Sequence, residues 1–365
     1  MTGRPRSSRR DFLTGRAAAN TLADVIAGVF GREVDDEVQP SAPESNYLVR
    51  VARPAMACEF EVVLNAGEHD AATAAAILAL DLVGELEDQL SVFREHSEVS
   101  ALNRRAATEE VAVEPRLFDL LVAAEELHCR TGGAFDITAG PLSQAWGFSR
   151  RSGTVPTPEA LAAALARVGN KHIELDRERR TVRYRQAGIE INLGAIGKGY
   201  ALDRAAEVLE SHGVCNFMLN GGTSSVLAHG TQGGTTGGWT LGLRNPLRPL
   251  RRVGEITLID RALATSGSTA QFFIHQGRRL GHILDPRTGW PAEGVLSSTV
   301  IAPTAAAADA LSTAFYVLGP AAAREYCQED NQVAAIMMVP SGRRGAVDVH
   351  TAGNLEGVWH LLAEG

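Results

Sequence analysis

Two oxygen-bearing side chains stand four positions apart in an otherwise apolar segment of this chain. Asp309 and Thr313 belong to the run Thr304-Ala-Ala-Ala-Ala-Asp-Ala-Leu-Ser-Thr313, and a spacing of four places both on one face of a helix. A carboxylate on such a face is costly to bury unless it is paired, and oxygen-only ligands suit Mg²⁺. The pair therefore predicts a magnesium site, and an Asp that is hydrogen-bonded on a helix surface is the alternative.

A glycine-rich segment with a lysine indicates phosphate binding. In Asn192-Leu-Gly-Ala-Ile-Gly-Lys-Gly-Tyr200, we expect a strand to end, small residues to turn the chain, and a helix to begin with Lys198 in its first turn. Free N–H groups, the positive end of a helix dipole and an ammonium group together suit a phosphate. The segment is neither a Walker A loop nor a Rossmann fingerprint, and a turn that simply needs glycine explains it equally well.

Two further segments carry residues suited to catalysis or to binding a flat ring. His282 precedes the turn Asp285-Pro-Arg-Thr-Gly289, where a histidine can be a general base, a phosphate contact or a structural residue. Phe135 and Asp136 follow two glycines. Their loop is expected either to hold a ring by stacking and edge hydrogen bonds or to pack Phe135 inward.

The elements that must position these residues mix helices and strands without βαβ alternation. Alternating apolar residues predict a strand at Glu59–Leu64 and a strand meander between His172 and Leu193. Helical spacing and capping residues predict helices over 71–90, over 115–130, from Thr157 onward, over 197–212 and over 304–318. The expected fold class is α+β, with mixed, largely antiparallel sheets flanked by helices.

The composition excludes several classes of protein. Hydrophobic residues make up 45% and charged residues 21% of the chain, as in globular proteins. A formal net charge of −8 argues against sequence-independent binding to nucleic-acid phosphates. Aromatic residues make up only 5% of the chain, which argues against a base-stacking surface. No stretch is long and apolar enough for a transmembrane helix. The cysteines lack metal-site spacing and are expected to be small buried side chains: Cys58, Cys129, Cys215 and Cys327.

The first 45 residues are predicted to be a leader and linker, followed by one domain over residues 46–365. Ser8-Arg9-Arg10-Asp11-Phe12-Leu13 is similar to a twin-arginine motif, which predicts export to the periplasmic side. The apolar stretch that should follow is interrupted by Asp24. A basic leader on a cytoplasmic protein is therefore the alternative.

Taken in order, these segments resemble the ApbE family of FAD:protein FMN transferases. The resemblance extends from about Tyr47 to Met338. It is carried by Met56-Ala-Cys-Glu-Phe60, Leu90-Ser-Val-Phe-Arg94, Ser97-Glu-Val-Ser-Ala-Leu-Asn103, Gly133-Ala-Phe-Asp136, Asn192–Asp203, Leu219-Asn-Gly-Gly222, Ala264-Thr-Ser-Gly267, His282–Gly289 and Ala308-Asp-Ala-Leu-Ser-Thr313. It implies a T-fold-like single catalytic unit of two subdomains.

The resemblance also implies an activity: Mg²⁺-dependent transfer of FMN from FAD to a Thr or Ser hydroxyl of an acceptor protein, with release of AMP. The implied acceptors are Rnf- or Nqr-type subunits or flavin reductases that carry a Ser/Thr-Gly-Ala-Ser/Thr-like segment. The positions matched to FAD contacts are Met56, Phe93, Ala134, Phe135, Asp136, Asn192, Lys198 and Leu284. Those matched to the metal are Ala195 (through its carbonyl), Asp309 and Thr313. His282 is matched to the reacting pyrophosphate, and Asp285 is a second candidate for the base.

Three positions depart from the family pattern. Ala57-Cys58 replaces Gly-Thr, Asn192 replaces a common Asp, and Ser312 replaces a second acid of some members. The last two lower the negative charge around the metal. Two other functions therefore stay open, an Mg²⁺-dependent FAD pyrophosphatase that gives FMN and AMP, and a non-catalytic FAD-binding protein. Phe93 bears on the first, because an aromatic ring there is expected to stack on the flavin and exclude water.

Overall fold

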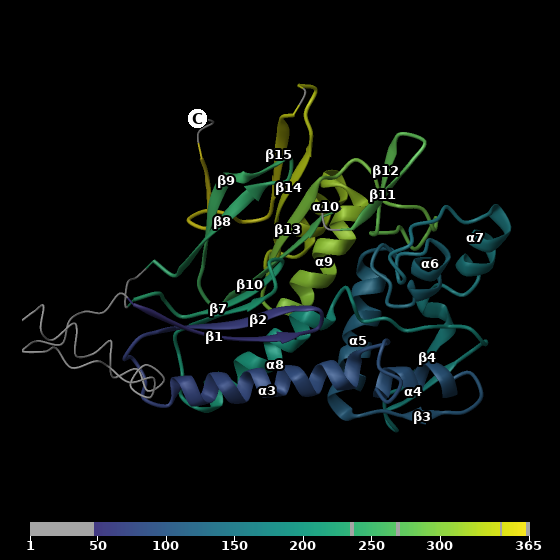
Figure 1. Ribbon diagram of the computed structural model, residues 1–365, viewed down its shortest axis with the longest axis horizontal. Coiled ribbons are helices and arrows are strands. Elements are labelled where there is room, and N and C mark those ends of the chain that lie inside the picture. Colours follow the sequence, from purple (N-terminus) through teal and green to yellow (C-terminus); the bar gives the residue numbers. More distant parts are fainter. Residues whose placement is uncertain (1–46, 234–236, 268–270, 344, 363–365) are drawn as a thin grey trace, which may run out of the picture. The chain divides into compact units, whose positions relative to one another are not determined.

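The centre of the computed structural model is an eight-stranded sheet in which all neighbouring strands are antiparallel (Figure 1). The structure describes residues 47–362, except 234–236, 268–270 and 344. In spatial order the strands are β1 (Leu48–Ala55), β2 (Cys58–Asn65), β6 (Phe217–Gly221), β7 (Ser225–His229), β10 (Arg261–Gly267), β13 (Ser297–Ala302), β14 (Ala334–Pro340) and β15 (Val347–Ala352). The predicted α+β class with largely antiparallel sheets is confirmed.

Alternating apolar side chains give this sheet two buried faces. In β2, Val62 joins the core on one side of the sheet and Val63 joins the core on the other. β13 repeats the pattern with Val300 and Ile301. Because successive side chains of a strand point to opposite faces, both faces of the sheet must be covered.

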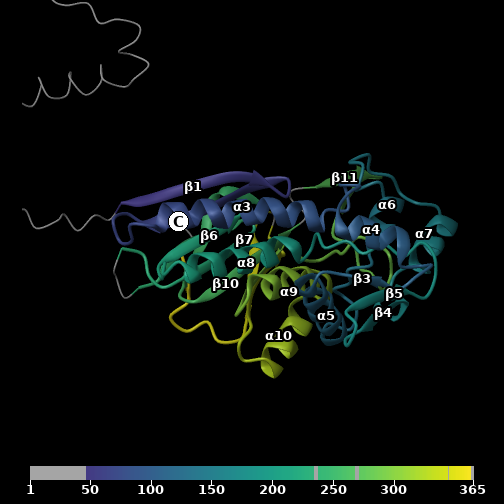
Figure 2. The same cartoon turned by 90° about the horizontal axis from the view of Figure 1, so that it is seen from below.

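Helices cover the first face of the sheet. α3 (Ala72–Leu90), α8 (Gly197–Ser211) and α9 (Ala305–Leu318) pack against the strands from β1 to β13 (Figure 2). α10 (Pro320–Glu329) packs against β14 and β15. The Oγ1 atom of Thr304 accepts the N–H of Ala307 at 3.2 Å. Thr304 therefore caps α9, as its position before the alanine run predicts.

A three-stranded sheet covers the other face. It consists of β8 (Trp239–Asn245), β9 (Arg248–Leu258) and β16 (Trp359–Leu361), in the order β16-β9-β8. Trp239 and Ile256 pack with Val63 and Ile336 of the large sheet in a second core. β8 lies at the edge of this small sheet.

The remaining elements gather toward the right of Figure 1. They are α4 (Glu98–Arg105), β3 (Val111–Ala112), α5 (Pro115–Arg130), α6 (Gly140–Ala145), α7 (Pro158–Leu165), the 3₁₀ turn Asn170–His172, β4 (Ile173–Asp176), β5 (Thr181–Tyr184), β11 (Phe272–His275) and β12 (Arg278–Gly281). A separate small core there contains Trp146, Phe148 and Leu284. The predicted helix over 115–130 is confirmed, as are those over 71–90, 197–212 and 304–318 to within one residue at an end.

The last part of the predicted strand meander is wrong. Residues 189–193 form no strand, although Ile189 and Ile191 are buried. The side chain of Asn103 bonds both the N–H and the C=O of Ile191, each at 2.9 Å. The amide side chain of Asn103 thus makes the backbone hydrogen bonds that a neighbouring strand would make. The burial of Ile189 and Ile191 explains why apolar residues alternate here without a strand.

Two further expectations concern the cysteines and the ends of the chain. Of the four cysteines expected to be buried, Cys327 is buried and Cys58 is half-buried, whereas Cys129 and Cys215 are exposed, so the expectation is wrong for these two. Within the described ranges, no helix is both long and apolar enough to cross a membrane. The predicted leader over residues 1–45 lies outside the described residues.

Candidate active site

A cavity of about 1220 Å³ brings together most of the residues singled out from the sequence. Its lining includes Phe93, Ala134, Phe135, Asp136, Asn192, Ala195, Lys198, His282, Leu284, Asp309 and Thr313. Met56 and Asp285 do not line it, although Leu284 and Pro286 on either side of Asp285 do. Residues from five separate segments of the sequence therefore meet at one place.

Asp309 is a buried carboxylate that lines this cavity. Its side chain is 7% exposed and lies on α9, with Oδ2 3.8 Å from the Nζ atom of Lys198. Oδ2 accepts the N–H of Gly199 at 2.7 Å, and Oδ1 accepts the Ser225 hydroxyl at 2.6 Å. Burial raises the pKa of Asp309, whereas the Lys198 charge and these hydrogen bonds lower it. The carboxylate is thus compensated on two sides by groups from α8 and β7.

The first turns of α8 and α9 are locked together, which fixes Lys198 against Asp309. Asp203 of α8 accepts the N–H groups of Ala305 and Ala306 at 2.7 and 2.9 Å, so it caps α9 from a neighbouring helix. Burial raises the pKa of Asp203 to about 7, against the lowering effect of these two bonds. The helix starting at Gly197 therefore carries both the cation of the site and a cap for the helix that carries its carboxylate.

The candidate metal ligands near Asp309 are oxygen atoms. Ser266 hydroxyl lies 3.1 Å from that of Thr313 and 2.8 Å from that of Ser312. Nowhere in the described ranges do three His, Cys, Asp or Glu side chains gather as a metal cluster. One carboxylate, one hydroxyl and the carbonyl of Ala195 remain as candidate ligands. This set fits Mg²⁺, which keeps water and substrate phosphates as its other ligands.

Asn192 lies in the loop that leads into α8. Its side-chain Oδ1 atom accepts the backbone N–H of Gly194 at 2.9 Å. Its backbone N–H donates to the carbonyl of Ile137 at 2.7 Å. Asn103 holds the preceding residue, Ile191, from α4. The loop is thus pinned at both ends before the chain enters the helix at Gly197.

His282 follows β12 and is held by one carbonyl group. Its Nδ1 atom lies 3.1 Å from the backbone oxygen of Gln271. A carbonyl only accepts hydrogen bonds, so Nδ1 carries the proton and Nε2 of the neutral ring has a free lone pair. Burial lowers the pKa of His282, opposed by the bond to Gln271. The ring is neutral near pH 7 and suited to accept a proton.

The carboxylate of Asp285 is held by a neighbouring arginine. Both oxygens of its carboxylate accept hydrogen bonds from the Arg287 guanidinium at 2.8 Å. The turn that it opens is anchored by Trp146, whose indole N–H donates to the carbonyl of Gly289 at 2.7 Å. The structure therefore gives Asp285 a role in shaping the turn after His282.

The loop with Phe135 and Asp136 is firmly held. Phe135 is 1% exposed and packs in the main core, so the inward-packed alternative describes its ring. Asp136 Oδ1 accepts the N–H of Thr138 at 2.7 Å, and Oδ2 lies 3.1 Å from Nδ1 of His128. The nearby Asp136 carboxylate raises the pKa of His128.

Phe93 and Met56 differ in exposure and setting. Phe93 is 77% exposed at the wall of the cavity. Met56 and Ala57 form the turn between β1 and β2, with φ values of 49° and 59°. Two positive φ values in a two-residue hairpin turn define a type I′ turn, where glycine is favoured. Ala57 thus keeps the turn that glycine would form, at some cost in strain.

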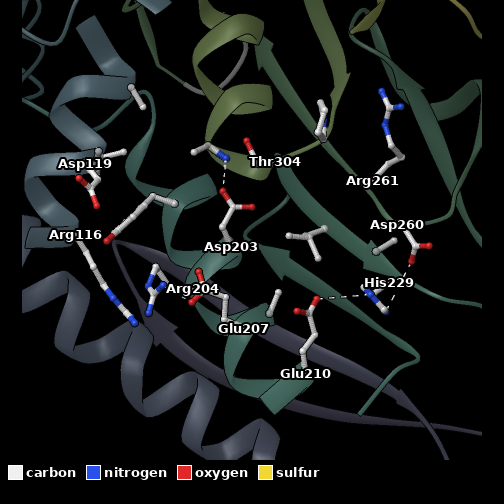
Figure 3. Close-up of a pocket in the computed structure, with 18 residues that line it drawn as sticks. Arg116, Asp119, Asp203, Arg204, Glu207, Glu210, His229, Asp260, Arg261 and Thr304 are labelled. Carbon is white, nitrogen blue, oxygen red and sulfur yellow. Dashed lines mark hydrogen bonds and ion pairs between the residues drawn. The ribbon is translucent and has the colours of Figure 1, made fainter. Parts of the chain in front are cut away.

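A second cavity, of about 570 Å³, lies behind α8 (Figure 3). Figure 3 shows Asp203 reaching toward α9, with Glu207 and Glu210 further along the same helix. The charged groups pair with one another: Arg204 with Glu207, and His229 with Glu210 at 3.6 Å. This cavity contains none of the residues that the sequence marks for phosphate chemistry.

Some residues of the site could not be found from local sequence patterns. Ser225 and Asp203 contact α9 from segments far away in the sequence, and His128 contacts Asp136 from α5. Ser225 follows the motif Leu219–Gly222, which was the only signal near it. The fold and the cavity define the class of the protein: an α+β protein whose cavity gathers a buried carboxylate, a lysine and a histidine.

Comparison with known proteins identifies the family. The model of the ApbE family matches residues 56–337, so the chain belongs to the ApbE family. It is 34% identical to the FAD:protein FMN transferase of Vibrio cholerae over 262 residues, which is 71% of this chain and 77% of that protein. It is 30% identical to the Escherichia coli K12 protein of the same name over 266 residues, 71% of this chain and 75% of that protein.

Solved structures of the family share the fold. The ApbE protein of Thermotoga maritima superposes with a TM-score of 0.75 at 30% identity, over 83% of this chain and 97% of that chain. The flavin transferase ApbE of Vibrio cholerae gives a TM-score of 0.74 at 28% identity, over 86% of this chain and 99% of that chain.

Proposed function

We propose that this protein transfers FMN from FAD to a Ser or Thr hydroxyl of an acceptor protein and releases AMP. The observation that carries the proposal is the convergence of Asp309, Lys198 and His282 on one cavity. The name FAD:protein FMN transferase, given to the Vibrio cholerae and Klebsiella pneumoniae relatives, supports FAD as donor and a protein as acceptor. Phe93, Ala134, Phe135, Asp136, Asn192 and Leu284 are the proposed FAD contacts in the cavity, with Met56 at the nearby hairpin turn.

Mg²⁺ is the proposed metal. Asp309, Thr313 and the carbonyl of Ala195 would hold it. When bound, the ion would stabilise the negative charge that develops on the pyrophosphate oxygens. Lys198 supplies a fixed positive charge beside the same carboxylate. Ser312 and Asn192 carry no charge, so Asp309 is the one carboxylate among the proposed ligands.

His282 is the proposed base. The acceptor oxygen bonds to the phosphorus of the FMN half, the bond from that phosphorus to the bridging oxygen breaks, and AMP leaves with the electron pair. The proton of the hydroxyl goes to Nε2 of His282, because Nδ1 already donates to Gln271. Asp285 is less suited to this step, since the Arg287 guanidinium occupies its carboxylate.

The test is an incubation of the purified protein with FAD, Mg²⁺ and a peptide that contains a Ser/Thr-Gly-Ala-Thr segment. A matched peptide with Ala at the acceptor position is the control. Mass spectrometry should show one FMN added to the Thr peptide only, with AMP released in equal amount. Free FMN and AMP without peptide modification would identify a pyrophosphatase, and bound FAD without turnover a binding protein. Either result contradicts the proposal.

We also propose that the acceptor is a subunit of an Rnf- or Nqr-type complex or a flavin reductase, and that the leader exports the protein to the periplasmic side. The motif at Arg9-Arg10 supports export. A fusion of residues 1–45 to a reporter should reach the periplasm, and the same fusion with both arginines changed to Lys should stay in the cytoplasm. Equal export of the two fusions would contradict the proposal.

A further inference from the structure

Part of the cavity wall is formed by β8, which carries none of the proposed FAD contacts. Six consecutive residues, 241–246, line the cavity there, together with Pro249 and Ile256 of β9. Side chains of a strand alternate between its faces. A surface touched by every residue in a row includes the backbone of the strand, and Ile256, the cross-strand partner of Leu241, adds part of one face of the sheet.

β8 is an edge strand of its sheet. Its ladder to β9 is regular from Trp239 to Leu243, and the register shifts at Arg244. In the sheet β16-β9-β8, no second neighbour pairs with β8 within the ranges that the structure describes. An edge strand presents N–H and C=O groups that can pair with another chain. Such a row inside an enzyme cavity is suited to an extended peptide.

The same cavity is also lined by a residue with an unpaired buried hydroxyl. Ser297 of β13 is 6% exposed and lines the cavity, and its Oγ atom is buried with no hydrogen-bond partner among the described residues. It shares a strand face with Ile301, which packs toward the small sheet. A buried hydroxyl without a partner is unfavourable. A ligand that passes between β13 and β8 would satisfy it.

The charges of the wall favour a segment without basic residues. Arg151 and Arg244 line the cavity, as do Arg50, which pairs with Glu61 at 3.1 Å, and Lys198, which lies 3.8 Å from Asp309. The carboxylates that line it, Asp136 and Asp309, already face His128 and Lys198. A neutral or acidic strand therefore meets less repulsion here than a basic one.

We propose that the edge of β8 binds the acceptor protein as an added β-strand, with Ser297 contacting that strand from the opposite wall. The inference rests on the proposed function, because the occupant is the segment that brings its hydroxyl to His282. Main-chain pairing holds the segment extended, so it accepts varied side chains around the Thr or Ser.

The first experiment is an N-methyl scan of the acceptor peptide, with initial rates of FMN transfer. Strand addition predicts a KM raised at least about tenfold when alternate amides are methylated, and little change at the amides between them, because only every second N–H faces β8. Equal effects at all positions, or none, would overturn the proposal. If no peptide of any kind receives FMN, the proposed function itself has failed, which is a different result.

The second experiment compares two neighbouring serines. Ser297→Ala should raise the KM for the peptide roughly three- to tenfold and leave the Kd for FAD unchanged. Ser298→Ala is the matched control, because Ser298 is fully buried and also lacks a hydrogen-bond partner for its Oγ in the described structure, but does not line the cavity. Its KM should equal that of the wild type. Equal KM values for both variants would show that Ser297 makes no contact with the acceptor.

Discussion

Gly199 of α8 and Ala305 of α9 meet backbone to backbone: a Cβ atom on Gly199 would lie 2.0 Å from the carbonyl oxygen of Ala305. The same approach lets the Gly199 N–H reach Asp309 at 2.7 Å. The two helices that carry the cation and the carboxylate of the site can therefore sit together only because residue 199 has no side chain.

Gly199→Ala should lower the free energy of unfolding by about 3 kcal/mol or more, because neither backbone can move without breaking the Asp203 cap. Gly197→Ala is the control in the same turn, since a Cβ there would lie 3.8 Å from its nearest neighbour, Leu193. That variant should keep its stability or gain up to about 1 kcal/mol. Denaturant unfolding of both variants measures the effect, and equal stability would disprove the close-contact account.

The sequence predicts the parts of the site that local spacing determines. A spacing of four places Asp309 and Thr313 on one face of a helix. The position of Lys198 just after the glycine-rich turn places it in the first turn of the next helix. The contact of Asp309 with Ser225, which is 84 residues away in sequence, depends on which strand packs under α9. Ile191 shows the reverse case: the alternation that predicted a strand reflects its burial, but a side chain, Asn103, replaces the predicted strand partner. The cavity wall made by the edge of β8 has no local signal, because an edge is defined by the strands that are its neighbours.

The pH dependence of transfer should report His282. Burial lowers its pKa below the ordinary value of 6.5, so the neutral base is present at pH 7 and is lost as the pH falls through the lowered pKa. The rate should therefore fall on the acid side of pH 6.5 and be level above it.

His282→Asn should reduce kcat by about 10²–10⁴-fold and remove this acid limb from a pH–rate profile. The control is His275→Asn, because His275 is exposed on β11, and its profile should match that of the wild type. An unchanged acid limb in His282→Asn would assign the titration to another group.

Asp203 should make stability depend on pH. Its pKa is raised by burial from 3.8 to about 7, so the folded state binds a proton that the unfolded state releases. Its contribution to stability is full below about pH 4 and is lost as the pH rises through about 7.

The unfolding temperature of the wild type minus that of Asp203→Asn should therefore decrease between pH 5 and pH 8. Glu207→Gln serves as the control, because Glu207 lies one turn along α8 and its side chain is 55% exposed. The unfolding temperature of the wild type minus that of Glu207→Gln should change less over this pH range, because solvent screens an exposed charge. A constant difference for Asp203→Asn across this range would contradict the raised pKa.

Phe93 should control the balance between transfer and hydrolysis. Its ring is 77% exposed at the cavity wall, where stacking on the flavin would hold FAD and exclude water. Phe93→Asn should raise FMN release in the absence of peptide, and Phe93→Tyr, which keeps the ring, should not. Chromatography of free FMN measures both, and identical release from the two variants would rule out shielding by the ring.

We propose that Asp309 supports Mg²⁺-dependent transfer of FMN to a protein hydroxyl. The most direct measurement is the mass of a Thr-containing acceptor peptide after reaction with FAD, using wild-type protein with Mg²⁺, wild-type protein with a chelator, and Asp309→Asn with Mg²⁺. We expect one added FMN in the first reaction and a rate at least about 10²-fold lower in the other two. Equal modification in all three, or FMN release with an unmodified peptide in the first, would contradict it.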